Sequence, residues 1–438
     1  MPSPPEPPLH WRDCRLEPIL GFPRPRELAK SLEVQGEEWI ALLESGGGLQ
    51  HRSRYSFLAW GRRKSSETDA IRAYEELERL ADDKCRALPC RSPTFFLVSY
   101  EAVVGEEPWL SRLVGRHEWP GMTAFSPEYV VVYDHAGGRV SVCPGDTPLP
   151  APASRKESFS AEGPTYETSR KGFEAMVADA LERIRAGEAF QVVLSRVERY
   201  RVWGSLFSAY ERLADANPSP YLYYARLGGR VIIGSSPELL VKLEAGRVET
   251  HPIAGTRPRG STPIEDIELE VELLNDEKER AEHVMLVDLA RNDITRVSIP
   301  GTVQVTSFMD IERYETVMHI VSRVEGVTRP STTFVEALKA LHPAGTVSGA
   351  PKPRAMEIIA ELEEEARGPY AGAIGVAGSS AGEAAIVLRS AWLLDDGETL
   401  EARAGAGIVY DSKPEREYME TVQKLGSLKR ALGVDMCG

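Results

Sequence analysis

The chain has 438 residues, of which 42% are hydrophobic and 8% aromatic, so it can bury one large core or two moderate ones and is not a disordered protein. Its 52 basic and 66 acidic residues give a net charge of −14, which excludes long-range attraction to nucleic acid or to anionic membranes. An anionic substrate would therefore need local positive charge, such as a metal ion or a suitably placed arginine.

The cysteines and the apolar pattern predict a cytoplasmic protein outside the membrane. The five cysteines are scattered and form no C-x-x-C pair, which suits a reducing compartment. The start, MPSPPEPP, lacks the basic and apolar segments of a signal peptide. The sequence also contains no run of about 18 apolar residues, the length needed to cross a bilayer.

Residues 1–142 form an N-terminal region in which strands and one helix are expected. Alternating apolar residues predict strands at 94–100 and 128–135, and helical periodicity predicts a helix at 66–85. The stretch 143–164, rich in proline and serine, interrupts all periodicity and is predicted to be a surface connection.

Residues 165–438 mix helices and β-hairpins without regular βαβ alternation. Apolar residues at helical spacing end at Gly187, where a left-handed cap is expected. Strands are expected at 190–202, 221–227, 230–236 and 239–251, and a helix at 205–217. This order predicts an α+β fold built on large, mainly antiparallel sheets.

Two expected helices, residues 264–293 and 414–432, each carry a Glu-x-x-Glu pair on one face. The pairs are Glu279 with Glu282 and Glu417 with Glu420. Taken alone, such a pair is usually a solvated acidic face. If the two pairs meet, carboxylates about 4 Å apart repel by roughly 4 kcal/mol at an effective dielectric constant of about 20. A divalent cation would relieve this repulsion, and ligation by oxygen alone favours magnesium over zinc.

Ordered motifs through the C-terminal two thirds resemble the chorismate-utilising enzyme family. They include GEAFQVVLSR (187–196), PSPYLYYAR (218–226), IGSSPELLVK (233–242), HPIAGTRPRG (251–260), DEKERAEHVMLVDLARND (276–293), HPAGTVSGAPKPRAM (342–356), RGPYAGAIG (367–375), AIVLRSA (385–391) and RAGAGIVYDSKPEREYMET (403–421). The resemblance implies an α+β unit with two large packed, mainly antiparallel β-sheets flanked by helices, and catalytic residues within 165–438. It also implies that the four glutamates surround Mg²⁺, which would hold the ring carboxylate of chorismate.

Several residues have both a structural and a functional interpretation. Arg389 is either half of a buried ion pair or a clamp for a carboxylate, and the resemblance implies that it holds the enolpyruvyl carboxylate together with Tyr370. Glu238 is either a turn residue or, by resemblance, the general acid that protonates the departing C4 hydroxyl. His319 is either a core histidine or a residue beside the reacting ring.

The remaining candidates lie in short glycine- and threonine-containing motifs. Gly405, Ala406 and Gly407 form either a tight strand turn or a bare stretch of backbone that approaches the substrate. The other candidates are Gly255 and Thr256 of PIAGT, Thr346 of GTVSG and Lys424 of the C-terminal helix. The two threonines either contact substrate oxygens or cap turns, and Lys424 taken alone is a helix-surface residue.

Two positions indicate which reaction the family member performs. In relatives that add water at C2 a lysine activates the water, but the matching residue here is Gln191, which cannot act as a base. Many relatives that form aminodeoxychorismate have PIKGT, whereas this chain has Ala254 in that motif. The resemblance therefore implies amination at C2, loss of the C4 hydroxyl and elimination of pyruvate to give anthranilate. Formation of aminodeoxychorismate is the alternative.

Partners and an effector are also implied. No cysteine lies in a glycine-flanked nucleophile motif, so a separate glutamine amidotransferase subunit is expected to supply ammonia. LLES and PSPYL resemble the family's tryptophan pocket and contribute Glu44, Ser45, Pro220, Tyr221 and Leu222. A tryptophan-binding sensor without catalysis is the remaining alternative, which the intact glutamate pairs oppose.

Overall fold

Wholly apolar or alternating segments form the strands, as their patterns predict. The computed structural model describes residues 14–46, 54–81, 85, 93–113, 118–153, 158–314 and 317–434. In this part of the chain the strands are β1 Arg15–Pro18, β2 Trp39–Glu44, β3 Tyr55–Thr68, β4 Thr94–Val98, β5 Met122–Asp134, β6 Arg139–Cys143, β7 Phe159–Glu167, β8 Gln191–Gly204, β9 Tyr221–Leu227, β10 Arg230–Ser236, β11 Leu239–Glu244, β12 Arg247–Thr250, β13 Ile253–Pro258, β14 Gln304–Arg313, β15 Val317–Val327, β16 Gly349–Ala350, β17 Ala373–Ala377, β18 Gly382–Ile386, β19 Ser390–Leu393 and β20 Thr399–Ile408.

Side chains cap the starts of five of the described α-helices, namely those of Ser169, Ser205, Thr262, Asp276 and Thr333. The helices are α1 Pro25–Val34, α2 Ala73–Leu80, α3 Arg170–Arg185, α4 Leu206–Ala216, α5 Pro263–Asn275, α6 Glu277–Thr295, α7 Phe334–Leu341, α8 Gly345–Ser348, α9 Lys352–Leu362 and α10 Pro414–Leu432, with the 3₁₀ helices η2 Tyr100–Gly105 and η3 Pro108–Leu113. Gly187 follows α3 with a φ of +84°, which confirms the expected left-handed cap.

Four expectations about element boundaries were wrong. The single strand expected at 239–251 is the hairpin of β11 and β12. The single helix expected at 264–293 is two helices, because Asp276 has an extended ψ of 110° and its side chain accepts from the backbone N–H groups of Lys278 and Glu279, capping α6. The helix expected at 66–85 is limited to α2, and β3 continues to Thr68. Strand β7 begins at Phe159, inside the stretch 143–164 that was expected to be a connection.

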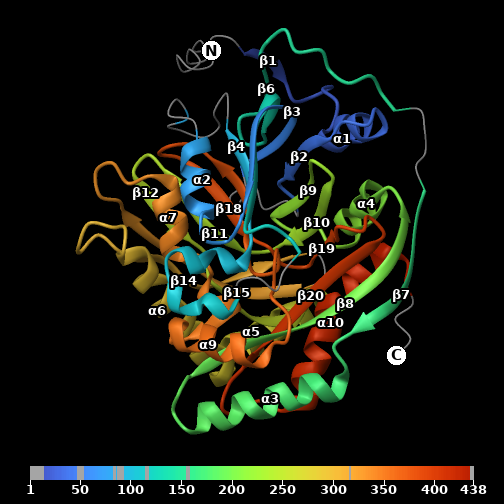
Figure 1. Ribbon diagram of the computed structural model, residues 1–438. Coiled ribbons are helices and arrows are strands. Elements are labelled where there is room, and N and C mark those ends of the chain that lie inside the picture. Colours follow the sequence, from blue (N-terminus) through green and yellow to red (C-terminus); the bar gives the residue numbers. More distant parts are fainter. Residues whose placement is uncertain are drawn as a thin grey trace.

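The α+β class with mainly antiparallel strands is confirmed. The described strands join into one hydrogen-bonded network of twenty strands, so the two expected sheets are continuous with each other. The N-terminal strands join the later strands at two places in this network: β2 pairs with β9, and β4 pairs with β17. The N-terminal region (blue in Figure 1) therefore shares its sheet with the region that carries most of the candidate site residues.

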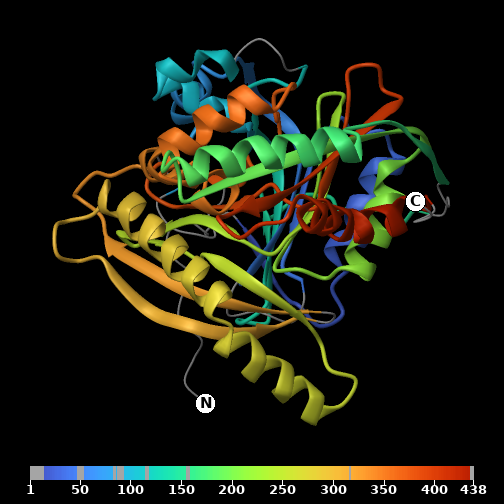
Figure 2. The same ribbon diagram turned by 90° about the horizontal axis from the view of Figure 1, so that it is seen from below.

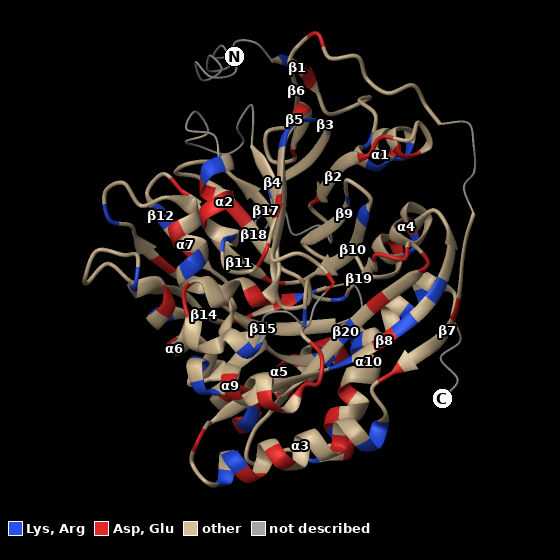
Figure 3. Ribbon diagram, viewed as in Figure 1, with Lys and Arg blue, Asp and Glu red and all other residues tan. Residues whose placement is uncertain are grey.

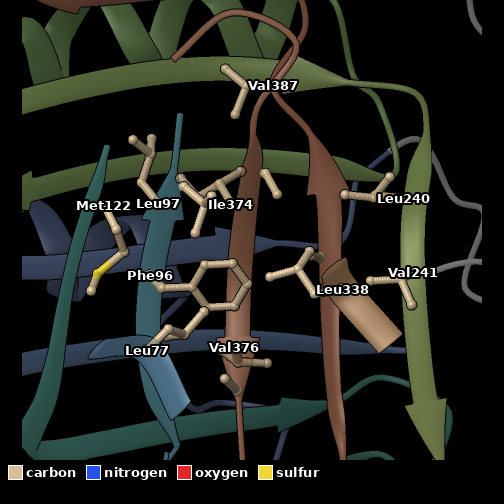
Figure 4. Packing of buried hydrophobic residues seen from close by; sticks show 14 of the residues in the cluster. Leu77, Phe96, Leu97, Met122, Leu240, Val241, Leu338, Ile374, Val376 and Val387 are labelled. Carbon is tan, nitrogen blue, oxygen red and sulfur yellow. The ribbon is translucent and has the colours of Figure 1, made fainter. Parts of the chain in front are cut away.

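Helices cover the sheet on the side of β8 and β20. Helices α3 and α10 contact each other, and both pack against this pair of strands, as Figure 2 shows from below. A large apolar core lies around β17, where Leu77 of α2 and Leu338 of α7 meet Phe96, Ile374 and Val376 of the strands (Figure 4). The chain has rigid, buried strands running from this core toward the candidate site.

Charge and cysteines add two further findings. Acidic and basic residues are interspersed along α3 and the other outer helices (Figure 3). In the part of the chain that the structure describes, no helix is both long and apolar enough to cross a membrane.

A disulfide joins Cys14 to Cys143, and Cys85 is also disulfide-bonded. Reduced cysteines were expected, as in a cytoplasmic protein, and these disulfides differ from that expectation. Cys14 and Cys143 are 129 residues apart, and their spacing gave no sign that they pair.

Candidate active site

The two Glu-x-x-Glu pairs converge from α6 and α10. Desolvation, followed by the charges of Glu279 and Glu420, raises the pKa of Glu282 to about 7. Desolvation also raises the pKa values of Glu279 and Glu417, with Glu420 adding to both. The mutual effects show that the carboxylates of the two helices lie close enough to repel each other, so they are not two separate solvated faces.

Gln191 lies beside this acidic group at the start of β8. Its Nε2 donates to Glu282 Oε1 at 2.8 Å, and its Oε1 is buried without a hydrogen-bond partner in the described part of the chain. A Cβ on Gly407 would lie 2.7 Å from the Gln191 Nε2, so glycine is needed for this approach. Thr346 of α8, which packs against β8, also has a buried hydroxyl without a partner among the described residues. Unpaired buried polar atoms of this kind indicate a binding site.

Alternate glycines of β20 let side chains from other elements approach its backbone closely. A Cβ on Gly405 would lie 2.6 Å from the Tyr370 hydroxyl, so Tyr370 occupies the space over that glycine. The Gly405 carbonyl accepts from Lys424 Nζ at 2.9 Å, and Lys424 also contacts Glu420 at 2.7 Å. Lys424 is thus joined to the site and is not simply a surface residue. Ala406 points the other way, because its side chain packs in an apolar cluster under the helices.

His319 is held on β15 by the adjacent strand β13. Its Nδ1 is 3.0 Å from Thr256 Oγ1 and 3.1 Å from the Gly255 carbonyl oxygen. Gly255 has a φ of +70° at a bulge in β13, and a Cβ there would lie 3.3 Å from Glu279 Oε2. The ring of His319 also meets Tyr314 edge-on, with centroids 5.3 Å apart. The motif PIAGT therefore links the histidine to the acidic group.

Arg389 follows β18 in the chain, and Glu238 is joined to the last residue of that strand. Desolvation lowers the pKa of Arg389, while Tyr314 partly opposes that effect. Within the described residues its guanidinium makes no ion pair, so the structural ion-pair interpretation is not supported. Glu238 is buried, and its backbone carbonyl accepts from the N–H of Ile386. Tyr314 lies near enough to Arg389 to affect its pKa, and it packs against His319. The strand that holds His319 also approaches Glu279 through Gly255.

A buried ion pair between Arg367 and Glu363, close in sequence to Tyr370, was not predicted from the sequence. The Arg367 guanidinium donates to both oxygens of Glu363, to the Val193 carbonyl at 2.6 Å and to the Val347 carbonyl at 2.8 Å. Glu101, from η2, accepts from the backbone N–H of Arg367 at 2.6 Å. These bonds fasten the segment before Tyr370 to β8 and α8. No local pattern in the sequence identifies contacts between residues so far apart.

A second pocket lies at the other end of β17 and β18. Of the predicted effector residues, Glu44, Tyr221 and Leu222 line it, whereas Ser45 and Pro220 are not among its lining residues. The other lining residues are Leu43, Tyr55, Phe57, Tyr223, Ile374, Gly375, Val376, Glu383 and Ala385. Desolvation raises the pKa of Glu383 to about 7. The pocket has aromatic and apolar walls with two carboxyl groups, a combination that suits an aromatic amine.

Comparison with known proteins agrees with this architecture. Residues 38–430 match the family described as chorismate binding enzyme. The chain is 42% identical over 427 residues to anthranilate synthase component 1 of Saccharolobus solfataricus, covering 96% of this chain and 99% of that relative. The chain belongs to the chorismate binding enzyme family.

Two more proteins are similar to this chain. The chain is 52% identical over 265 residues to anthranilate synthase component 1 of Methanothermobacter thermautotrophicus, covering 60% of this chain and 57% of that relative. The crystal structure of anthranilate synthase component I from Streptococcus pneumoniae has a TM-score of 0.74 and 35% identity, over 86% of this chain and 92% of that one. The fold of this chorismate binding enzyme is thus that of its family.

The donor set of this family member suits Mg²⁺. The converging groups are carboxylates with amide and hydroxyl oxygens nearby, and magnesium usually takes one or two protein carboxylates together with water and substrate oxygens. Among the described residues, no three acidic, histidine or cysteine side chains are spaced to hold a metal by themselves. The arrangement therefore fits an ion shared with an anionic substrate better than an ion enclosed by protein.

Proposed function

We propose that this chain converts chorismate and ammonia to anthranilate and pyruvate, as the synthase component of an anthranilate synthase. The observation that carries the proposal is the similarity along nearly the whole chain to anthranilate synthase component 1 of S. solfataricus. The site is consistent with it, because Gln191 stands where a water-activating base would be required and instead donates its amide hydrogen to Glu282.

The chain's own residues supply positioning and proton transfer. Arg389 and Tyr370 bind the enolpyruvyl carboxylate, and Glu238 donates a proton to the C4 hydroxyl, which leaves as water while ammonia bonds to C2. A proton is then lost from C2 and the C3–O bond breaks, so the ring becomes aromatic and the enolate of pyruvate leaves. The methylene carbon of that enolate takes up one proton, which balances the proton lost from C2 and gives pyruvate. His319, fixed by Thr256, lies beside the ring during these steps. Holding one substrate for both steps lowers their entropic cost.

Mg²⁺ is proposed as the cofactor, held by Glu279, Glu282, Glu417 and Glu420. When bound, it would supply the positive charge that the ring carboxylate needs in a protein of net charge −14. The raised pKa values of Glu279, Glu282 and Glu417 support this role, because burial and, to a smaller extent, neighbouring carboxylates oppose their charged forms, and a bound cation would stabilise those forms.

A separate glutamine amidotransferase is proposed to provide ammonia. Hydrolysis of glutamine by a cysteine nucleophile needs a free thiolate. Cys14, Cys85 and Cys143 are all disulfide-bonded, while Cys90 and Cys437 lie outside the described residues. The name component 1 carried by the relatives also implies a second component.

The product provides the decisive test. Purified protein with chorismate, Mg²⁺ and ammonium at alkaline pH is expected to form fluorescent anthranilate and one equivalent of pyruvate. Glutamine is expected to replace ammonium only after a glutaminase subunit is added. Mass analysis that finds 4-amino-4-deoxychorismate without pyruvate would contradict the proposal in favour of its nearest alternative, and isochorismate or salicylate would contradict the interpretation of Gln191.

The second pocket is proposed to bind tryptophan as a feedback inhibitor. Its aromatic and apolar walls fit an indole, and its carboxyl groups, Glu44 and Glu383, fit the ammonium group. The pocket is distinct from the candidate active site, although both are built on β17 and β18.

Tyr221→Ala is expected to relieve inhibition by tryptophan more than it lowers activity without tryptophan, because it removes a wall of the pocket and no residue of the active site. Calorimetry should show weaker tryptophan binding. Tyr166→Ala, at an exposed tyrosine on β7, is the control and should leave inhibition unchanged. Wild-type protein that binds no tryptophan would disprove the effector assignment.

A further inference from the structure

Tyr223, Gly234 and Ser390 form a row across three neighbouring strands. Tyr223 of β9 is opposite Gly234 of β10, which is opposite Ser390 of β19. The Tyr223 ring fills the place of a side chain on Gly234, since a Cβ there would lie 2.2 Å from the ring carbon Cζ. The ring thereby crosses the middle strand, and its hydroxyl hydrogen-bonds with Ser390 Oγ and donates to the Leu388 carbonyl at 3.4 Å.

These bonds hold the residues on both sides of Arg389. Arg389 has a φ of +48°, a left-handed conformation that a non-glycine residue keeps only when its surroundings impose it. The Ser390 hydroxyl donates to the Leu388 carbonyl at 2.6 Å, and the Ser235 N–H donates to the Arg389 carbonyl at 3.3 Å. The direction of the Arg389 side chain therefore depends on contacts made by β9 and β10.

The same tyrosine is a wall of the second pocket. Tyr221, Leu222 and Tyr223 follow one another in β9, and all three line that pocket. A ligand that fills the pocket therefore lies against Tyr223. A shift of this residue would move its hydroxyl relative to Ser390, so the pocket and the Arg389 turn share one residue.

We propose that Tyr223 is a positioning residue for Arg389. Its hydroxyl fixes the turn that aims the guanidinium at the substrate carboxylate, and its ring transmits occupancy of the second pocket to chorismate affinity. The positioning of Arg389 rests on the role of that arginine in the proposed function, and the transmission rests on the tryptophan assignment.

Tyr223→Phe, which removes only the hydroxyl, tests the positioning. We expect the KM for chorismate to rise by about 3- to 10-fold, the cost of one hydrogen bond, with kcat unchanged. Ser390→Ala should raise the KM at least as much, because it removes this bond and also the bond from Ser390 to the Leu388 carbonyl. The double variant should be no worse than Ser390→Ala alone, because that change already removes the partner of the Tyr223 hydroxyl.

Tyr224→Phe is the matched control. Tyr224 is the next residue of β9, points to the opposite face, and donates its hydroxyl to Glu33 Oε2 at 2.5 Å. It should cost stability without changing the KM for chorismate. An unchanged KM in Tyr223→Phe, or an equal increase in Tyr224→Phe, would overturn the positioning role whether or not tryptophan binds.

Tryptophan titration of Tyr223→Phe tests the transmission. We expect the dissociation constant for tryptophan to change little, while the factor by which saturating tryptophan raises the KM for chorismate falls toward one. An undiminished factor would overturn the transmission. Wild-type protein that binds no tryptophan would overturn it too, together with the effector assignment, whereas the KM comparison would still decide the role of the hydroxyl.

Discussion

Replacing Glu282 or Glu420 by glutamine is expected to lower turnover by about 100-fold or more while leaving the fold intact. Each substitution removes one charge from a group of carboxylates that repel one another, so folding should not suffer. Mg²⁺ binding, measured by calorimetry without substrate and with chorismate, should weaken in both variants. Circular dichroism and thermal unfolding should show a native fold.

Two glutamates on the same helices are matched controls. Glu277 lies in the first turn of α6 and Glu415 in the first turn of α10, and both are exposed. Glu277→Gln and Glu415→Gln change the net charge by the same amount outside the site, and they should retain turnover and Mg²⁺ affinity. Wild-type activity in both Glu282→Gln and Glu420→Gln would end the metal assignment.

Arg389→Met is expected to raise the KM for chorismate by about 100-fold, because it removes charge-assisted hydrogen bonds to a carboxylate. The same variant should be at least as stable as wild type in urea unfolding. A desolvated guanidinium without an ion pair among the described residues opposes folding, and methionine removes that cost while keeping a similar volume.

Arg201→Met on β8 serves for comparison, since Arg201 is exposed and paired with Glu398 at 3.2 Å. The KM should not change, and the free energy of unfolding should change by no more than about 0.5 kcal/mol. If Arg389→Met instead unfolds the protein and Arg201→Met does not, Arg389 has a structural partner and is not a substrate clamp.

Local patterns were sufficient to predict most elements, whereas the acidic site was predicted from the family resemblance. Helix α10 occupies 414–432 as expected, because Pro414 starts it and Gly433, in a left-handed conformation, follows its last residue. The charges of Glu279 and Glu420 both raise the pKa of Glu282, so the two Glu-x-x-Glu pairs lie near each other, while their role in binding Mg²⁺ stays a prediction. Glycines 405 and 407 lie within a strand and admit Tyr370 and Gln191 over β20, and their approach to the substrate also stays a prediction.

Contacts between distant segments could not be predicted in this way. The break at Asp276 depends on one side chain capping α6 within a long stretch of helix-forming residues. Glu383 and Tyr223 are strand residues like many others until sheet pairing places them in a pocket. Ser45 and Pro220 lie in motifs that mark the pocket without lining it, because the residues beside them provide its walls.

The contact of Glu101 with the Arg367 segment bears on how this enzyme can be divided. Glu101 accepts the backbone N–H groups of Arg367 and Gly368, and β4 just before it pairs with β17. A C-terminal fragment would lack both and would leave two buried amide groups unpaired next to Tyr370. Gene fission within residues 143–164 should therefore yield two polypeptides that are inactive when produced separately and regain activity only by reassembling a shared sheet.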